Sequence, residues 1–150
     1  MGDIILVKEQ KFSSRSEIGK LFGGNHQYGI TVSSKANAIL LFKNERELYS
    51  DYFYPKGSDD YCLYTGIGRS GHQDNPNNKN YYLNMAVLMH KINNRSLLVF
   101  EKRKSNHCFV GEYELTEMHQ NIQPDDSGRS RRVFVFRLKK ISDTINILIT

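Results

Sequence analysis

The feature that most constrains this chain is an apolar, strand-like run that ends in tyrosine and leads directly into a glycine-rich loop. Residues 64–73 read Tyr-Thr-Gly-Ile-Gly-Arg-Ser-Gly-His-Gln, which combines three glycines with an arginine and a histidine. Glycine permits backbone conformations closed to other residues and lets a partner approach the bare chain. The loop does not end in the Gly-Lys-Ser/Thr of a P-loop, and we expect no small-nucleotide site in it. It predicts a close backbone approach to another kind of partner.

The remaining pattern predicts a mainly β chain with two helices. A Ser-x-x-Glu capping box at Ser14 begins a helix that ends near Phe22, and a second, apolar helix is expected at residues 79–93. Residues 49–60 and 119–132 are predicted to be surface loops. Strands are expected at residues 4–7, 28–33, 38–42, 61–65, 97–101, 107–115 and 133–139, with 141–149 as a last strand or an added segment. The fold class is therefore α+β, mainly β, with a curved sheet or small barrel.

Size and composition indicate one domain over residues 1–150, with a sizeable core. The net charge of +5 and the pI of about 9.2 favour a polyanionic partner without proving one. No apolar run is long enough to span a membrane and residues 1–10 lack a signal-peptide layout, so we expect a cytoplasmic protein that does not bind membranes. Cys62 and Cys108 fall on expected strands, where buried free thiols are favoured over a disulfide.

The order of these segments resembles the SRA/YDG domain, in the version found before HNH nuclease domains in modification-dependent restriction endonucleases. The resemblance covers residues 18–140, and it rests on the segments 22–30, 49–53, 64–73, 75–80, 96–100, 109–113 and 133–138. It implies a PUA-like β-barrel flanked by two or more helices. It also implies a double-stranded DNA partner that carries a modified base, and a possible downstream nuclease domain. The oligomeric state does not follow from it.

Catalysis by this chain alone is not favoured by its residues. His107 and His119 do not supply the clustered His and Asn of an HNH site, and the run Glu101-Lys102-Arg103 has arginine where a PD-(D/E)xK nuclease needs lysine. No cysteine or histidine spacing fits a zinc site. We therefore assign no catalytic residue, no metal and no cofactor, and we keep a stand-alone nuclease only as an alternative.

Recognition of a modified base requires that the base leave the stack and enter a pocket with aromatic faces and edge-reading polar groups. The aromatic loop at residues 49–54 suits this task, although tyrosines are often ordinary packing residues. A carboxylate is a natural acceptor for the exocyclic amine of cytosine. By the resemblance, the expected pocket residues are Tyr49, Asp51, Phe53, Tyr28, Gln27, Asn25 and His26.

Basic residues cluster where expected strands begin or end, which suits either solvated strand ends or contacts with DNA phosphates. By the resemblance, related domains carry acidic residues where this chain has Ile67 and His72 and a glutamine where it has Arg69, so its glycine loop is more cationic. The expected backbone and groove contacts are Arg69, His72, Lys79, Arg103, Lys104, Arg129 and Arg131.

Together these patterns predict a DNA-binding reader domain that flips a modified cytosine of the 5-methyl or 5-hydroxymethyl class. We expect it to be the specificity module of a modification-dependent restriction system. The alternatives are a stand-alone nuclease and a PUA-like RNA-binding module.

Overall fold

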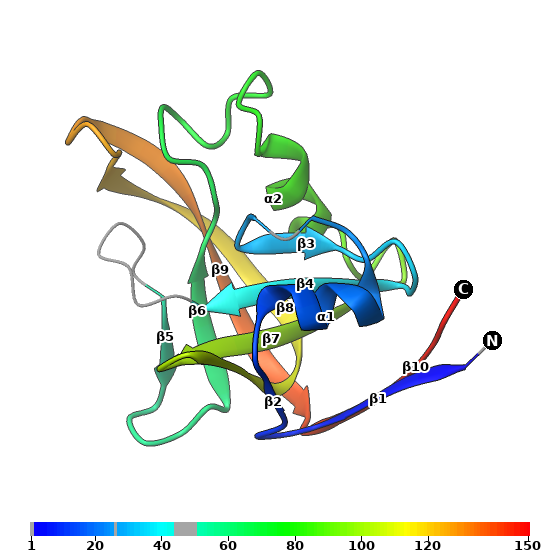
Figure 1. Cartoon of the computed structure of the whole chain (residues 1–150). Helices are drawn as coiled ribbons and strands as arrows, with labels where there is room; N and C mark the ends of the chain where they lie inside the picture. Colours follow the sequence, from blue (N-terminus) through cyan, green and yellow to red (C-terminus); the bar gives the residue numbers. More distant parts are fainter. Residues whose placement is uncertain (1, 26, 44–50) are drawn as a thin grey trace.

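The computed structural model describes residues 2–25, 27–43 and 51–150 and consists of a strongly curved β-sheet with two helices (Figure 1). Along the described sheet the strand order is β3-β4-β7-β8-β9-β6-β5, with β2 paired to β8. These strands are β2 (Lys11–Phe12), β3 (Ile30–Val32), β4 (Ala38–Lys43), β5 (Tyr52–Tyr54), β6 (Tyr61–Thr65), β7 (Ser96–Arg103), β8 (Asn106–Pro124) and β9 (Ser130–Ser142). The β4–β7 pair is parallel, and the other described pairs are antiparallel. The mainly β α+β prediction is confirmed, with a curved and open sheet rather than a closed barrel.

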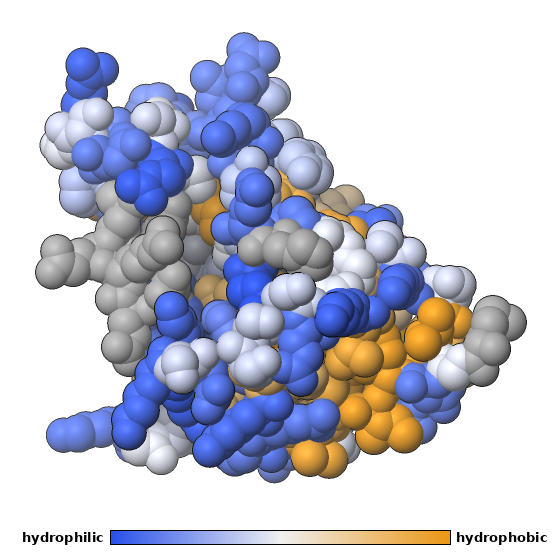
Figure 2. All heavy atoms as spheres, viewed as in Figure 1, coloured by the Kyte–Doolittle hydropathy of each residue, from blue (hydrophilic) through white to orange (hydrophobic). Residues whose placement is uncertain are grey.

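A separate two-stranded ribbon joins the two ends of the chain. It pairs β1 (Asp3–Val7) with β10 (Thr144–Leu148), which confirms the last strand suggested by the sequence. Its inner side chains, such as Leu6 and Ile145, are buried, whereas Ile5 and Leu148 on the outer side are exposed. In Figure 2 apolar atoms gather at the lower right, over the part of the molecule that holds this ribbon in Figure 1.

Two apolar clusters cover the two faces of the sheet. Alternate residues of β4 point to opposite sides, so that Leu41 joins one cluster and Leu40 joins the other. The first cluster includes Leu83 of α2 (Tyr81–Leu88), and the second includes Ile18 of α1 (Arg15–Phe22). Burial on both faces explains why these strands read as near-continuous apolar runs in the sequence.

The first helix begins as its capping box predicts. The Ser14 side chain accepts a hydrogen bond from the Glu17 N–H, and the Glu17 carboxylate accepts from Ser13. The second helix is shorter than the expected residues 79–93. His90 explains its end, because Nδ1 lies 2.9 Å from the Arg95 carbonyl oxygen and Nε2 accepts from the Leu115 N–H at 3.1 Å. These contacts hold residues 90–95 outside the helix, in the connection between α2 and β7.

Two segments predicted to be loops contain strands. Residues 52–54 of the expected loop 49–60 form β5 and pair with β6. The expected loop 119–132 is largely a hairpin, because β8 continues to Pro124 and β9 begins at Ser130. The arms of this hairpin extend beyond the main body of the sheet (Figure 1), and they carry many polar side chains. Residues 116–124 of β8 include no buried residue, so they lack the apolar alternation that reveals a strand.

Cys62 and Cys108 are buried free thiols, as expected from the sequence. Neither helix in the described part of the chain is long and apolar enough to cross a membrane.

Candidate functional site

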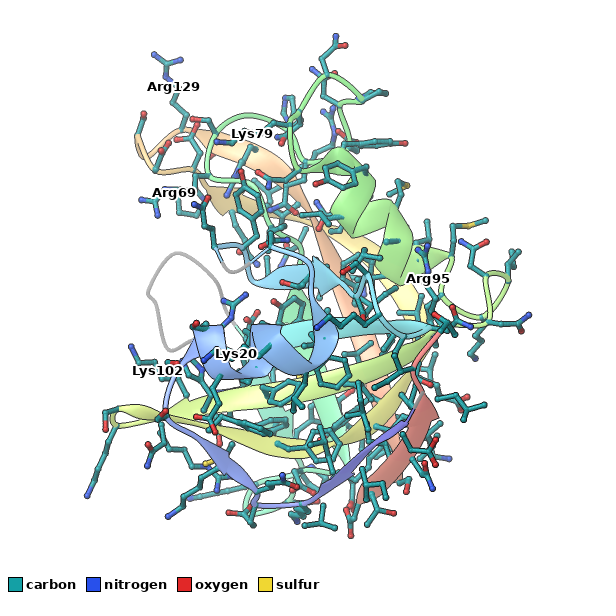
Figure 3. The ribbon with its side chains drawn as sticks, turned by 45° about the vertical axis from the view of Figure 1, so that its right-hand side comes forward. Lys20, Arg69, Lys79, Arg95, Lys102 and Arg129 are labelled. Carbon is teal, nitrogen blue, oxygen red and sulfur yellow. The ribbon has the colours of Figure 1, made fainter. Side chains whose placement is uncertain are left out.

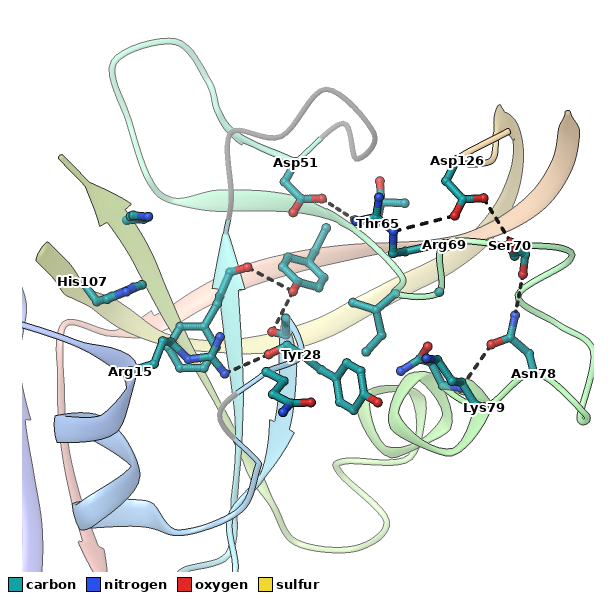
Figure 4. Close-up of a pocket in the computed structure, with 18 residues that line it drawn as sticks. Arg15, Tyr28, Asp51, Thr65, Arg69, Ser70, Asn78, Lys79, His107 and Asp126 are labelled. Carbon is teal, nitrogen blue, oxygen red and sulfur yellow. Dashed lines mark hydrogen bonds and ion pairs between the residues drawn. The ribbon is translucent and has the colours of Figure 1, made fainter. Parts of the chain in front are cut away.

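A cavity of about 700 Å³ opens beside the glycine loop (Figure 4). Its walls come from the start of α1, residues 27–29, the end of β4, residues 64–70 and residues 78–80. Lys102 and His107 from β7 and β8, Asp51 and Asp126 complete the lining. The cavity falls within the size range of sites that enclose small organic molecules, roughly 300–1,000 Å³.

Asp51 is one of two acidic residues in the described part of the chain that line the cavity, and Asp126 is the other. Its carboxyl oxygen accepts a 2.7 Å hydrogen bond from the backbone N–H of Thr65, the last residue of β6. Burial raises the pKa of Asp51 to about 7, although the Thr65 hydrogen bond and the charge of Lys43 oppose the rise. At neutral pH the group can therefore accept hydrogen bonds as a carboxylate, or both accept and donate as an acid.

Tyr64 fixes the cavity wall. Its hydroxyl lies 2.9 Å from the Gly29 carbonyl oxygen and 3.2 Å from that of Phe42, so it bridges two neighbouring segments. Gly29 permits this approach, because a Cβ atom there would lie 2.8 Å from the Tyr64 hydroxyl oxygen. The sequence identified Tyr64 as part of a marker for the fold, and the structure shows it also lining the cavity.

Buried amide side chains hold the glycine loop in place. Gln73 donates to the Gly66 carbonyl oxygen at 2.6 Å and accepts from the Phe134 N–H at 2.9 Å. Asn84 of α2 accepts from the Ile67 N–H at 2.9 Å and donates to the Ile67 carbonyl oxygen at 2.8 Å. Both amides are fully buried. The loop is thus fixed from β9 on one side and from α2 on the other.

Residues 66–71 have the Gly-x-Gly-x-x-Gly spacing found in dinucleotide-binding loops. That motif works when a helix opens directly after the glycines within a βαβ unit, so that the helix N-terminus meets the phosphates. Here the next helix, α2, begins only at Tyr81, and β6 lies antiparallel to both of its neighbours. The spacing therefore lacks the structural context of a dinucleotide site.

The structure brings three of the expected pocket residues into the cavity, namely Gln27, Tyr28 and Asp51. Asn25 supports this segment from outside, since its side-chain oxygen accepts from the Gln27 and Tyr28 N–H groups. Phe53 does not line the cavity, because it packs against the core beside Tyr113. His26 and Tyr49 lie outside the described residues.

The expected DNA-contacting cations fall into different settings. Arg69 and Lys79 line the cavity, and in Figure 3 they lie at the same end of the molecule as the exposed Arg129. The Arg69 side chain is 61% exposed and lies 3.8 Å from the Asp126 carboxylate. His72 is exposed, and its Nδ1 accepts from the Arg132 N–H at 3.0 Å.

The other three expected cations lie in three different environments. Arg103 forms ion pairs with Glu9 and Glu101. These two carboxylates reduce the positive potential that Arg103 presents to a phosphate. Lys104 is exposed at the turn between β7 and β8. Arg131 is only 2% exposed and donates to the carbonyl oxygens of Gly68 and Gly71. Its position suits support of the glycine loop better than direct phosphate contact.

Several cavity residues were not predicted. Arg15 enters from the first position of α1, and Lys102 and His107 enter from paired strands. All three lie far from the glycine loop in sequence, and only Lys102 belongs to a basic cluster at a strand end that the sequence offered as a phosphate contact. Among the described residues no group of three or more His, Cys, Asp or Glu side chains could hold a metal ion.

The open curved sheet and its cavity agree with what sequence comparison shows about the chain. Residues 8–146 match the family model described as "ScoMcrA-like, SRA domain". The chain therefore belongs to the ScoMcrA-like SRA domain family, which confirms the resemblance to SRA domains seen in the sequence. No curated protein matches it significantly.

Solved structures of SRA domains have the same fold. The sulfur-binding and SRA domains of ScoMcrA, complexed with phosphorothioated DNA, match with 19% identity and a TM-score of 0.70 over 91% of this chain and 40% of that one. The SUVH5 SRA domain with hemimethylated CG DNA matches with 21% identity and a TM-score of 0.65 over 91% of this chain and 89% of the other. The modification-dependent endonuclease AspBHI matches with 12% identity and a TM-score of 0.69 over 95% of this chain and 44% of that one. The chain thus spans less than half of the two matched restriction proteins.

Proposed function

We propose that this chain is a reader domain that binds double-stranded DNA and takes a modified cytosine out of the helix into the cavity. The observation that carries the proposal is the Asp51 carboxyl, which lines the cavity and is oriented by the Thr65 N–H. The modification proposed is of the 5-methyl or 5-hydroxymethyl class. Family membership supports it, as do related SRA domains solved with methylated or hydroxymethylated DNA.

The edge of a cytosine matches what Asp51 offers. Its N4 amine donates and its N3 nitrogen accepts, so a protonated carboxyl can meet both atoms while a carboxylate can meet only the amine. The pKa of about 7 makes both forms available at neutral pH.

Among the described residues, three phenylalanine or tyrosine side chains line the cavity, namely Tyr28, Phe42 and Tyr64. Tyr28 precedes β3, and Tyr64 lies on β6. Stacking of a base on an aromatic ring contributes about 1–3 kcal/mol, which offsets much of the few kcal/mol needed to unpair and unstack it. We propose the half-buried Tyr28 as a stacking face in place of Phe53, because the Tyr64 ring is only 2% exposed and belongs to the core.

Phosphate contacts are proposed for Arg69, Lys79 and Arg129. They lie at the end of the molecule that holds the glycine loop and the β8–β9 hairpin (Figure 3). DNA affinity from such contacts is independent of sequence and falls with salt. We further propose that a nuclease domain or partner uses this chain for targeting, because the matched restriction proteins are longer than it.

A binding panel tests the proposal. Duplexes that differ only in one cytosine, which is unmodified, 5-methyl or 5-hydroxymethyl, are titrated at fixed salt. At least one modified duplex is expected to bind about tenfold or more tightly than the plain one, in line with the contribution of one pocket contact. Equal affinity for all three duplexes contradicts the proposal. Preferential competition by single-stranded RNA would instead support an RNA-binding module, and cleavage with Mg²⁺ would support a nuclease.

A further inference from the structure

One end of the cavity carries positive charge that the proposed reading of cytosine does not use. Arg15, Lys102 and His107 line this end and come from α1, β7 and β8. Figure 4 places Arg15 and His107 at the end opposite Arg69 and Asp126. We refer to Arg15, Lys102 and His107 as the cationic end of the cavity.

Arg15 is a partly buried cation without a carboxylate partner in the described part of the chain. Its guanidinium carbon lies 3.5 Å from the centre of the Phe42 ring. One terminal nitrogen donates to the Tyr28 carbonyl oxygen at 2.8 Å and to the Thr31 hydroxyl at 3.3 Å, and both acceptors are neutral. Burial lowers the pKa of Arg15 to about 10, which leaves it charged at neutral pH. Removing such a charge from water is costly when no anion compensates it.

Lys102 adds to the positive potential beside Arg15, whereas His107 is neutral at neutral pH because its pKa is lowered. Lys102 is exposed and forms no ion pair among the described residues, whereas the nearby carboxylate of Glu101 already pairs with Lys43 and Arg103. The pKa of His107 is lowered first by burial and then by the charges of Arg15 and Lys102. Its Nδ1 is buried and has no hydrogen-bond partner in the part of the chain that the structure describes.

We propose that the cationic end is an anion subsite, which binds an oxyanion carried by the nucleotide that enters the cavity. The proposal rests on the proposed function, because it assumes that the cavity receives a base. Phosphate and carboxylate oxygens are the groups that a guanidinium binds best, through paired N–H donors. At about 700 Å³ the cavity has room for more than an unsubstituted pyrimidine.

Two sources of the oxyanion share this chemistry. The first source is an acidic substituent on the base, such as a 5-carboxyl, since cytosine C5 adjoins the C4 carbon that carries the amine. The second source is a phosphate beside the flipped nucleotide.

The packing role of Arg15 is the simpler alternative, because its contacts with Tyr28, Thr31 and Phe42 join α1 to the cavity wall.

The test has two arms, each measured as dissociation constants at fixed salt. In the first arm, duplexes carry 5-carboxylcytosine, 5-hydroxymethylcytosine, 5-methylcytosine or cytosine at one position. In the second arm, each phosphate flanking the modified cytosine is replaced in turn by a neutral methylphosphonate. The variants are Arg15→Gln and Lys102→Gln. Lys20→Gln is the matched control, because Lys20 is an exposed cation in the last turn of the same helix and does not line the cavity.

The expected result is selective. In the wild type, the 5-carboxyl group strengthens binding, or one methylphosphonate weakens it, by about tenfold or more, as for a charge-assisted hydrogen bond. Arg15→Gln and Lys102→Gln are expected to reduce that difference, and Lys20→Gln to keep it. The arm that responds identifies the source of the anion.

Three outcomes distinguish the two proposals. If methylated DNA is preferred over plain DNA but neither arm shows a difference in the wild type, the anion subsite is wrong and the reader function stands. If the difference appears but both variants keep it, the subsite is also wrong. If no modified duplex is preferred, the reader function fails, and the subsite fails with it. Lys102→Gln keeps the test decisive if Arg15→Gln unfolds, because Lys102 is exposed.

Discussion

The backbone N–H of Thr65 donates a 2.7 Å hydrogen bond to the carboxyl of Asp51. Thr65 ends β6 and pairs with Val135 of β9, so the position of this carboxyl is set by the β9–β6 part of the sheet. The contact joins the segment that carries Asp51 to the start of the glycine loop. The group proposed to read the base and the loop that marks the fold are therefore parts of one structural unit.

Asp51 predicts a pH dependence of stability. Its pKa of about 7 in the folded chain lies above the ordinary aspartate value of 3.8. The folded chain therefore binds the proton more tightly than the unfolded chain, and stability falls as pH rises from about 4 to about 7. Asp51→Asn is expected to remove this fall and to raise the free energy of unfolding at pH 8 by about 1–4 kcal/mol. Urea unfolding at several pH values measures it, and an unchanged pH profile would contradict the prediction.

His90 predicts a pH dependence of the opposite sign. Burial lowers its pKa, although the Arg95 carbonyl opposes this, and its Nε2 must stay unprotonated to accept from the Leu115 N–H. The stability it supports is complete above pH 6.5 and is lost as pH falls below that value. In an Asp51→Asn background, which removes the competing effect, His90→Gln is expected to flatten the remaining acid sensitivity. Thermal unfolding between pH 5 and 8 measures it, and equal acid sensitivity with and without His90 refutes it.

Gln73 is expected to be a structural residue of the glycine loop. Gln73→Leu leaves the Gly66 carbonyl oxygen and the Phe134 N–H without their partner, at a cost of about 2 kcal/mol or more. Gln120→Leu is the matched control, because Gln120 is exposed and, among the described residues, its side chain bonds only Asp74. Its effect should stay within about 0.5 kcal/mol. Equal destabilisation by both changes in urea unfolding would mean that Gln73 does not hold the loop.

Arg69 is expected to contact phosphate rather than a base. Arg69→Ala should weaken binding to modified and plain duplexes by similar factors and reduce the salt slope by about 1. Arg95→Ala is the control, since Figure 3 places Arg95 away from Arg69, Lys79 and Arg129. Affinities at several salt concentrations measure the slope. A loss confined to modified DNA would assign Arg69 to the base pocket instead.

The sequence predicted the elements that have a strong local signal. The capping box located the start of α1, and continuous apolar runs located β4 and β7, because these strands are buried on both faces. The main parts of β8 and β9 were predicted, but their outer ends within residues 119–132 were missed because these lack a continuous buried face. A strand stabilised mainly by its partner leaves little trace in its own sequence.

The cavity was predicted only in part, for a related reason. Asp51, Gln27 and Tyr28 lie in segments that the resemblance to SRA domains identified. Arg15 and His107 reach the cavity through the packing of α1 and the pairing of β7 with β8, and such long-range contacts are not encoded locally. Phe53 lies in the same aromatic segment as Tyr52, yet the alternation of β5 turns it toward the core, where it stacks against Tyr113.

The central claim is that Asp51 reads a modified cytosine inside the cavity, and one ratio tests it most directly. The ratio is the dissociation constant for a plain duplex divided by that for the preferred modified duplex. Asp51→Ala is compared with wild type and with Asp60→Ala, an exposed aspartate outside the cavity. We predict that Asp51→Ala lowers the ratio about tenfold or more while Asp60→Ala leaves it unchanged. An unchanged ratio in a folded Asp51→Ala protein would contradict the account.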